Sequence, residues 1–213
     1  MDEDIDNITR ETLDYYERNA QQFFDGTVGH DVTQNIGALL AAIAAGGAQA
    51  PYSLLDVGCG PGRDLQTFAA MGHHAIGIDG SQAFVGMARA YSGCEVWRQD
   101  LVHLDLPPAR FDGVFANAVL FHVPSAALPR VLDDLYTTLR PGGVLFCSNP
   151  RGRNEEGWNG ERYGSYYDLE RWQQYMTAAK FSELHHYYRP PNLPREQQPW
   201  LASVWRKPLG ALG

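Results

Sequence analysis

The stretch 54–64 constrains the fold of this chain more than any other, because it joins an apolar segment to a glycine-rich turn. Residues 52–57 are mostly apolar and have the length of a buried strand. Three glycines follow at alternate positions: Gly58, Gly60 and Gly62. Without a Cβ, a glycine lets the backbone approach a ligand closely. A helix that begins near Arg63 would point free N–H groups at the same ligand. The stretch therefore predicts a strand, a turn and a helix that together hold a polar molecule.

Acidic residues follow two further segments of strand character. Asp79 ends the segment 75–79, and Asp100 follows the segment 94–98. From residue 52 onward, strand and helix patterns alternate, which predicts an α/β fold with a mainly parallel sheet and helices on both faces. In a doubly wound sheet of this kind, an acid at the tip of the second strand is placed to hold a ribose diol.

The segments on either side of this pattern have a different character. The first fifty residues indicate two helices, one that carries Tyr16 and Phe23 and ends at Gly26, and one that ends at Gly46. Residues 151–164 are rich in glycine and arginine, and they predict a loop. Three polar residues are predicted to cap the helices that follow them: Ser81, Ser125 and Asp168.

The spacing of the glycines indicates the type of cofactor. It does not follow the G-x-G-x-x-G pattern of dinucleotide-binding proteins. The pattern D-x-G-x-G-x-G, which starts at Asp56, resembles instead the first motif of class I S-adenosylmethionine (SAM) dependent methyltransferases. Asp79, Asp100 and the Arg-Pro-Gly-Gly run at 140–143 match the family in the same order along the chain, so the resemblance covers residues 54–150.

The resemblance implies a doubly wound, seven-stranded, mainly parallel sheet with an antiparallel last strand and an N-terminal helical lid. Residues 1–213 would form a single domain, with the lid in 1–50, the SAM-binding core in 51–150, and a substrate cap with the last strands in 151–213. Within the family, the sequence resembles small-molecule methyltransferases of the ubiquinone-biosynthesis and tellurite-resistance types. The expected activity is methyl transfer from SAM to a small molecule.

By this resemblance, the strand ends would hold SAM. Asp56 would fix the turn, or the ammonium through water, Asp79 would accept both ribose hydroxyls, and Asp100 would contact the adenine amine. Asn117 or the Ala116 carbonyl would meet the methionyl ammonium. Arg63, the first helical residue after the turn, is placed to pair with the cofactor carboxylate, and a plain surface arginine is the alternative. The full set of expected cofactor contacts is Asp56, Gly58, Gly60, Gly62, Arg63, Asp79, Gly80, Ser81, Asp100, Leu101 and Asn117.

Two residues are candidates for the reacting end of the site. His122 follows the fourth strand of the pattern, and imidazole titrates near neutrality, as suits a general base. A histidine that packs as a wall against the cofactor is the alternative. Tyr16 lies in a segment that resembles the lids of small-molecule methyltransferases, and simple core packing is its alternative. The expected acceptor-binding residues are His30, Arg153, Arg162, Tyr163, Tyr166, Tyr167 and Arg189.

The distribution of charge along the chain restricts the chemical class of the acceptor. The formal net charge of −8 argues against a nucleic-acid partner, whose phosphates need a basic face. Residues 1–150 hold 8 Lys and Arg against 18 Asp and Glu, whereas residues 151–213 hold 9 against 7. An acceptor with an anionic group such as a carboxylate would suit this basic cap, with arginines as bidentate donors. An ordinary solvated surface is the alternative.

The remaining features indicate where such a protein works. No apolar run is long enough to span a bilayer, and the acidic N-terminus is unlike a targeting peptide, so we expect a cytoplasmic protein that does not bind membranes. Cys59, Cys94 and Cys147 have spacings that suit neither disulfides nor zinc, and no metal site is expected. A monomer and a homodimer are both compatible with the sequence.

Three other functions share parts of this pattern. A nicotinamide oxidoreductase has a similar sheet but a different spacing of glycines. Methylation of a macromolecule would call for an added basic domain, or for an Asn-Pro-Pro-Tyr-type motif after the fourth strand, and the sequence has neither. A SAM-binding protein without catalytic activity would keep all the cofactor motifs, so the residues do not separate it from an enzyme. They also do not specify the acceptor molecule or the acceptor atom.

Overall fold

The computed structural model describes residues 2–210, with side chains from residue 4 onward. A seven-stranded sheet forms their centre, with the strand order β3-β2-β1-β4-β5-β9-β8. The strands from β3 to β5 in this order are parallel, and β9 runs antiparallel between β5 and β8. The predicted sheet, including its antiparallel last strand, is therefore confirmed. The strands are β1 (Ser53–Val57), β2 (His74–Asp79), β3 (Glu95–Arg98), β4 (Phe111–Asn117), β5 (Leu139–Pro150), β8 (Ser182–Arg189) and β9 (Trp200–Arg206).

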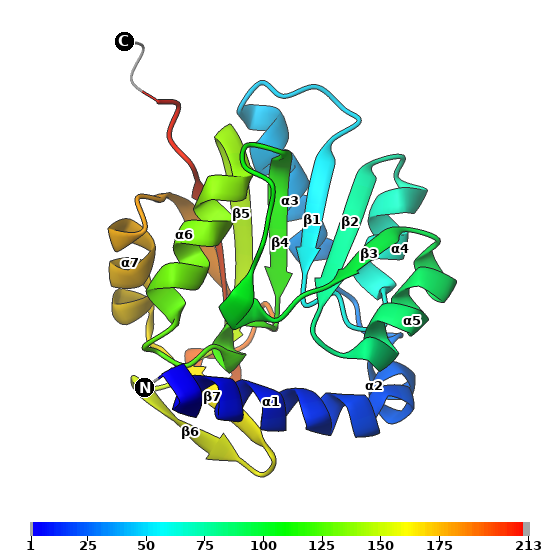
Figure 1. Ribbon diagram of the computed structural model, residues 1–213. Coiled ribbons are helices and arrows are strands. Elements are labelled where there is room, and N and C mark those ends of the chain that lie inside the picture. Colours follow the sequence, from blue (N-terminus) through cyan, green and yellow to red (C-terminus); the bar gives the residue numbers. More distant parts are fainter. Residues whose placement is uncertain (1, 211–213) are drawn as a thin grey trace.

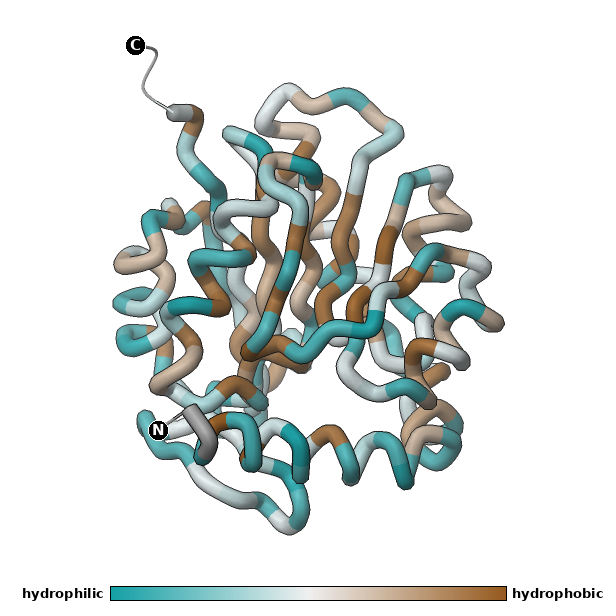
Figure 2. Tube along the Cα trace, in the orientation of Figure 1, coloured by the Kyte–Doolittle hydropathy of each residue, from teal (hydrophilic) through white to brown (hydrophobic). Residues whose placement is uncertain are grey.

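Helices cover both faces of the sheet (Figure 1). One face carries α3 (Thr33–Ala45), α4 (Arg63–Ala70) and α5 (Gln82–Ser92), and the other carries α6 (Leu128–Thr138) and α7 (Leu169–Ala178). Successive strand residues point to opposite faces, so Leu54 packs in the core beneath α3, whereas Leu55 packs beneath α6. Figure 2 shows apolar residues concentrated along the central strands. Both faces are buried, as the continuous apolar strands predict.

The predicted helix caps are correct in two places out of three. The Ser81 hydroxyl accepts a hydrogen bond from the Phe84 N–H at 3.2 Å, and the Asp168 carboxylate accepts one from the Arg171 N–H at 2.8 Å. The prediction for Ser125 is wrong, because α6 begins after Ala127. Ser125 donates its N–H and its hydroxyl to Glu156 instead, at 2.8 and 2.6 Å.

The lid predicted for residues 1–50 includes two helices that lie at the carboxyl ends of the parallel strands (Figure 1). They are α1 (Asp2–Arg18) and α2 (Ala20–Thr27). The sequence predicts one continuous helix here, but the chain breaks at Asn19, whose ψ of 16° is not helical. None of the helices in residues 2–210 combines the length and the apolar character that crossing a membrane requires.

Residues 151–164 are not the loop that their composition predicts. They contain β6 (Glu155–Asn159), which pairs antiparallel with β7 (Arg162–Tyr166). Asn159 pairs with Arg162, so the turn consists of Gly160 and Glu161, and Gly160 has φ +63°. A two-residue hairpin needs positive φ, which glycine adopts without strain. Gly160, which suggests a loop in the sequence, thus belongs to the turn of a hairpin. The hairpin lies beside α1 (Figure 1).

Candidate active site

The glycine turn between β1 and α4 uses its glycines for two purposes. All three have left-handed backbones, with φ of +62° at Gly58, +51° at Gly60 and +94° at Gly62. A Cβ on Gly58 would lie 2.2 Å from Val119 Cγ2, and one on Gly62 would lie 2.8 Å from the Cα of Ala88 in α5. These two glycines let the chain pack closely against itself. Gly58 and Gly60 also border a cavity.

Asp79, at the carboxyl end of β2, is bound to the same turn. Its Oδ2 accepts a hydrogen bond from the Gly60 N–H at 3.0 Å, and its Oδ1 accepts one from the Ser81 N–H at 2.9 Å. The residue is 9% exposed, and burial raises the pKa of its carboxyl to about 6 in spite of these hydrogen bonds. No Lys, Arg or His among residues 4–210 forms a salt bridge with it. Asp79 is therefore a buried carboxyl with acceptor capacity left for a ligand.

Asp100 lies at the end of the neighbouring strand, where it begins the short 3-10 helix η1 (Leu101–His103). Its Oδ1 accepts a hydrogen bond from the Val102 N–H at 3.1 Å. The Gln99 N–H donates to the Asp79 carbonyl at 3.1 Å and so links this strand end to β2. Gln99 and Asp100 border the same cavity as Asp79. The two acids predicted on neighbouring strand tips are thus brought to one site.

A cavity of about 610 Å³ lies between these strand ends and the lid. Small-molecule sites commonly measure roughly 300–1,000 Å³. The expected cofactor residues that line it are Gly58, Gly60, Arg63, Asp79, Gly80, Asp100, Leu101 and Asn117. The expected catalytic and acceptor residues that line it are Tyr16, His30, His122, Arg162 and Arg189.

Seven expected site residues do not line this cavity: Asp56, Gly62, Ser81, Arg153, Tyr163, Tyr166 and Tyr167. Asp56 is buried within β1, where burial and then the nearby Asp64 raise its pKa well above the usual range. Arg153 is exposed ahead of β6, and Tyr167 packs near Trp172 in the core. The composition of residues 151–213 indicates where arginines and tyrosines lie along the chain, but strand pairing decides which of them face the site.

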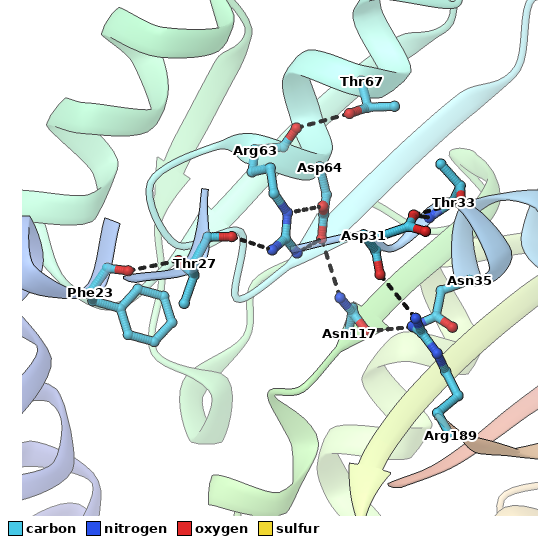
Figure 3. Close-up of polar contacts among 10 residues, drawn as sticks. All are labelled: Phe23, Thr27, Asp31, Thr33, Asn35, Arg63, Asp64, Thr67, Asn117 and Arg189. Atoms are coloured by element: carbon cyan, nitrogen blue, oxygen red, sulfur yellow. Dashed lines mark hydrogen bonds and ion pairs between the residues drawn. The ribbon is translucent and has the colours of Figure 1, made fainter. Parts of the chain in front are cut away.

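Arg63 is engaged within the protein (Figure 3). Its Nε and Nη2 donate to the Asp64 carboxylate at 2.7 and 2.9 Å, and its Nη1 donates to the Thr27 carbonyl at 2.9 Å. Asn117 Nδ2 also donates to Asp64, at 3.3 Å, and Asn117 Oδ1 accepts from Asn35 Nδ2 at 3.0 Å. A cofactor carboxylate would therefore compete with a bidentate ion pair for Arg63. The network ties the lid segments α2 and α3 to α4 and β4.

Tyr16 of α1 and His122 of η2 (Leu120–His122) meet at the cavity. The Tyr163 carbonyl only accepts hydrogen bonds, so His122 Nδ1, 2.7 Å away, carries the ring proton and donates to it. Nε2 of the neutral ring then accepts from the Tyr16 hydroxyl at 2.8 Å. Burial lowers the pKa of His122 to about 4 and raises that of Tyr16. The imidazole is therefore neutral at pH 7 with both nitrogens occupied, which fits a packed wall better than a free base.

Two arginines bring positive charge to the cavity wall. Arg162 lies over the rings of Tyr15 and Tyr16, 5.1 and 5.9 Å from their centroids, and its Nη1 is 3.4 Å from the Tyr16 hydroxyl. Arg189 Nη2 donates to the Asp31 carbonyl at 2.9 Å, and no residue from 4 to 210 accepts a hydrogen bond from its buried Nε. Neither guanidinium forms a salt bridge with a carboxylate in this part of the chain. Both keep positive charge available for a ligand.

Comparison with known proteins agrees with this geometry. Residues 54–143 match the family model of a methyltransferase domain. A ubiquinone biosynthesis O-methyltransferase from Aeromonas salmonicida is 36% identical over 101 residues, which are 45% of this chain and 42% of that protein. Residues 54–143 are thus similar to a methyltransferase domain. A trans-aconitate 2-methyltransferase from Azoarcus is 34% identical over 105 residues, covering 48% of this chain and 41% of that protein. The chain thus spans about two fifths of the length of these curated relatives.

The likeness in fold extends beyond the matched domain. This chain aligns over 96% of its length with 90% of the 1,6-didemethyltoxoflavin-N1-methyltransferase of Burkholderia thailandensis, with a TM-score of 0.75 and 21% identity. That structure was solved with 1,6-didemethyltoxoflavin and S-adenosylhomocysteine bound. At this identity the comparison concerns the fold, and it includes segments before and after residues 54–143.

The cavity suits SAM, the cofactor that the sequence motifs predict. A ribose diol offers two O–H donors, and Asp79 is a buried carboxyl that keeps lone pairs beyond its two backbone hydrogen bonds. Gly60 lines the cavity without a side chain, and a Cβ there would lie 3.7 Å from the Phe23 ring. Gln99 and Asp100, on the next strand end, add polar groups that suit an adenine edge.

Some cavity residues were not indicated by the motifs: Asn35, Asp64, Phe84, Phe121 and Trp200. Asn35 is 1% exposed in a largely apolar helix, and this polar residue on a core-facing position is a signal that the sequence does contain. Phe121 and Trp200 stand edge to face, with ring centroids 6.5 Å apart. Nothing in their local sequence distinguishes them from ordinary core aromatics.

Proposed function

We propose that this chain transfers the methyl group of SAM to a small-molecule acceptor that carries an anionic group. One observation carries the proposal: the cavity brings Asp79 and Asp100 together with the glycine turn beneath the N-terminal helices α1 and α2. An acceptor that must fit below α1 and α2, beside the cofactor, is small. This favours a metabolite over a macromolecule.

In this proposal the strand ends hold the cofactor. Asp79 accepts the ribose hydroxyls, Asp100 and the Leu101 backbone contact the adenine, and Gly60 faces the bound molecule. Asn117 lies at the end of β4 and is held by Asp64 and Asn35, so its amide is fixed in one orientation toward the methionyl part. SAM, when bound, supplies a methyl group activated by the sulfonium. The protein then has to position the reactants and exclude water.

The lid supplies the exclusion of water. Tyr16 packs against Phe23 and Phe84, with ring centroids 5.5 and 5.8 Å away, and Phe23 lies 5.3 Å from Phe84. These aromatic rings join α1, α2 and α5 over the cavity. We assign residues 1–50 as the lid, 51–150 as the SAM-binding core and 151–213 as the cap with the last strands, all in one domain. Tyr16 and His122 act here as a fixed polar wall at the reacting end.

The anionic group of the acceptor is assigned to the arginines of the cap. Arg162 and Arg189 line the cavity and have no carboxylate partner among residues 4–210. A guanidinium binds a carboxylate or a phosphate through two parallel hydrogen bonds, which fixes the orientation of the ligand. His30 lines the cavity from the loop between α2 and α3 and completes this side.

Calorimetric titration with S-adenosylhomocysteine tests the cofactor site, and an assay with methyl-labelled SAM and a metabolite extract tests the transfer. We expect saturable heat with one site per chain, and appearance of the label in a small product. No heat with either SAM or S-adenosylhomocysteine would contradict the proposed function. Binding of NAD in place of SAM would show that the site belongs to an oxidoreductase.

A further inference from the structure

A nucleophile that carries a proton needs a base within reach, and the cavity offers few. Besides His122, the cavity wall includes His30 and four aspartates: Asp31, Asp64, Asp79 and Asp100. Asp64 is held by Arg63, and Asp31 Oδ1 accepts both from the Thr33 N–H and from its hydroxyl, at 2.9 and 2.6 Å. Asp79 and Asp100 are bound to the backbone on the cofactor side. None of these aspartates is a free base at the acceptor end.

The two histidines do not supply that base either. His122 Nε2 accepts the Tyr16 hydroxyl, and its Nδ1 donates to a carbonyl. His30 is exposed in the loop after α2, and the hydrogen bond that the structure gives it comes from its backbone N–H. A general base works best when a second group orients it, as in catalytic triads and dyads. The acceptor end is thus rich in guanidinium charge and poor in bases.

We infer that the acceptor is a small carboxylic acid and that its ionised carboxylate oxygen is the nucleophile, so that the product is a methyl ester. This inference rests on the proposed methyl transfer and names its substrate class. A carboxylate is already deprotonated at neutral pH, because its usual pKa lies near 4. The new O–CH₃ bond replaces the S–CH₃ bond, whose electron pair stays on sulfur and cancels the sulfonium charge. No proton moves, so no base is required.

The residues of the wall suit such a nucleophile. Arg162 Nη1 is 3.4 Å from the Tyr16 hydroxyl, and the Tyr16 ring lies 5.8 Å from that of Phe84 in α5, the helix that follows Asp79, so this guanidinium stands toward the cofactor side of the cavity. The Tyr16 hydroxyl directs its proton to His122, and therefore does not neutralise the incoming carboxylate. Arg189 can hold a second polar group of the acceptor. Phe121 and Trp200 line the remaining wall and favour an apolar or planar body.

The chemical stability of the product tests this directly. The protein is incubated with SAM labelled with tritium in the methyl group, and with a metabolite extract supplemented by benzoate, phenylacetate and aliphatic di- and tricarboxylates. The labelled product is then treated with mild alkali, and the vapour is collected. A methyl ester releases its label as volatile methanol, whereas methyl ethers and methylamines keep it. We expect most of the label in the vapour.

The outcomes separate the two proposals. Label that survives alkali would overturn the carboxylate inference and leave the proposed methyl transfer intact. Binding of S-adenosylhomocysteine without transfer to the extract or to any acid of the panel would also count against the inference. Absence of both binding and transfer would overturn the proposed function itself.

Variants of the cap give a second, independent readout. For the acid that accepts the label, Arg162→Gln should raise KM by roughly 10- to 100-fold, as expected for a lost charge-assisted hydrogen bond, with little change in the affinity for S-adenosylhomocysteine. Arg162→Lys keeps the charge but cannot donate two parallel hydrogen bonds, so its KM should lie between those of wild type and Arg162→Gln. Arg153→Gln, at an exposed arginine outside the cavity, is the matched control and should behave as wild type.

The pH profile of the reaction distinguishes an acceptor that needs a base. If the nucleophile binds already ionised, kcat of the wild-type protein stays flat between roughly pH 6 and 9, because the carboxylate remains ionised. A kcat that rises with pH across this range would report a base that must first lose its proton, and would overturn the inference. Thermal unfolding of each variant, with and without S-adenosylhomocysteine, shows whether the lid and the cofactor site remain intact.

Discussion

The cavity has two walls that are built in different ways. The cofactor wall consists of the ends of β1 to β4, and it is shaped by glycines and by backbone N–H groups that donate to Asp79 and Asp100. The acceptor wall consists of α1, the loop between α2 and α3, the β6–β7 hairpin and the ends of β8 and β9. Its contacts join residues far apart in sequence, such as Tyr16 and His122, which are 106 positions apart.

A change in the cofactor wall disturbs the backbone of the sheet, because its glycines and acids also determine how β1, β2 and α5 pack. A change in the acceptor wall affects side chains on α1, on the loop between α2 and α3, on the hairpin and at the ends of β8 and β9. In the proposed function, acceptor specificity therefore resides in the acceptor wall. The variants below compare the two walls, beginning with the largest expected effect.

The largest effect is expected from Gly62→Ala in the cofactor wall. Gly62 has φ +94°, and a Cβ there would lie 2.8 Å from the Cα and 3.1 Å from the carbonyl oxygen of Ala88. Backbone atoms of a helix cannot rotate away, so the strained conformation and the overlap act together. We expect a loss of about 2–4 kcal/mol in the free energy of unfolding, measured by urea denaturation.

Gly86→Ala is the matched control for that variant. Gly86 lies in α5, two residues before Ala88, and a Cβ there would meet no atom within 4 Å. An alanine in a helix interior is favoured over glycine, so this variant should be more stable than wild type by about 0.5–1 kcal/mol. If both alanines had the same effect, close packing at Gly62 would not be what shapes the turn.

The second-largest effect is expected on the affinity of the cofactor wall for S-adenosylhomocysteine. Asp79→Asn keeps the shape of the side chain but replaces the carboxylate by a neutral amide. The carboxylate oxygens accept hydrogen bonds from the Gly60 and Ser81 N–H groups and, in the proposed complex, from the ribose hydroxyls. We expect the affinity for S-adenosylhomocysteine to fall by roughly 10- to 100-fold in a calorimetric titration at pH 7.5. Asp105→Asn, at an exposed position that follows η1, should leave it unchanged, because only the backbone of Asp105 bonds to Gln99 of the cavity wall.

Because the pKa of Asp79 is raised, the difference in stability between wild type and Asp79→Asn should depend on pH. The carboxyl has a pKa of about 6 in the folded chain and 3.8 as its ordinary value, so its contribution to stability is present below pH 3.8 and is lost as the pH rises through 6. The ligand-free Asn variant should therefore gain stability relative to wild type between pH 4 and 7. Melting temperatures that differ by a constant amount across this range would contradict the assigned cause.

The contrast between the walls also explains what the sequence predicts well. Asp79 and Asp100 follow apolar strand segments, and the carboxyl ends of parallel strands meet at one edge, so their convergence follows from local patterns. The hairpin is different: Arg162 faces the cavity and Tyr163 does not, because their strand pairs with β6 in one register. That register depends on the turn at Gly160 and on packing against α1, which no short segment specifies. Arg153 and Arg162 therefore cannot be told apart by sequence alone.

The third effect tests the acceptor wall through Tyr16→Phe. The variant leaves His122 Nε2 without its donor in a buried position, at a cost of about 1 kcal/mol in the free energy of unfolding. Tyr15→Phe is the control, because Tyr15 is the neighbouring tyrosine and meets Arg162 through its ring rather than its hydroxyl. We expect a lower melting temperature for Tyr16→Phe alone, and an unchanged affinity for S-adenosylhomocysteine in both.

The smallest effect is expected where the two walls are joined. The Ser81 N–H donates to Asp79, and the Ser81 hydroxyl donates to Glu17 of the lid at 2.6 Å. Glu17 also accepts from the Ala83 N–H at 3.0 Å, in the first turn of α5. These hydrogen bonds, first of all the one from Ser81, lower the pKa of Glu17. Because Glu17 is exposed to solvent, Glu17→Gln should cost only a few tenths of a kcal/mol at pH 7, roughly the value of a surface pair.

The sign of the shift predicts how that small difference changes with pH. Since the folded pKa of Glu17 lies below the ordinary 4.5, its contribution is present above pH 4.5 and is lost as the pH falls through the folded value. Urea denaturation of wild type and Glu17→Gln should therefore converge on acidification, whereas Glu11→Gln, exposed on the same helix, should match wild type throughout. A difference that persists at low pH would mean that the shape of the side chain, rather than its charge, holds the lid to the cofactor wall.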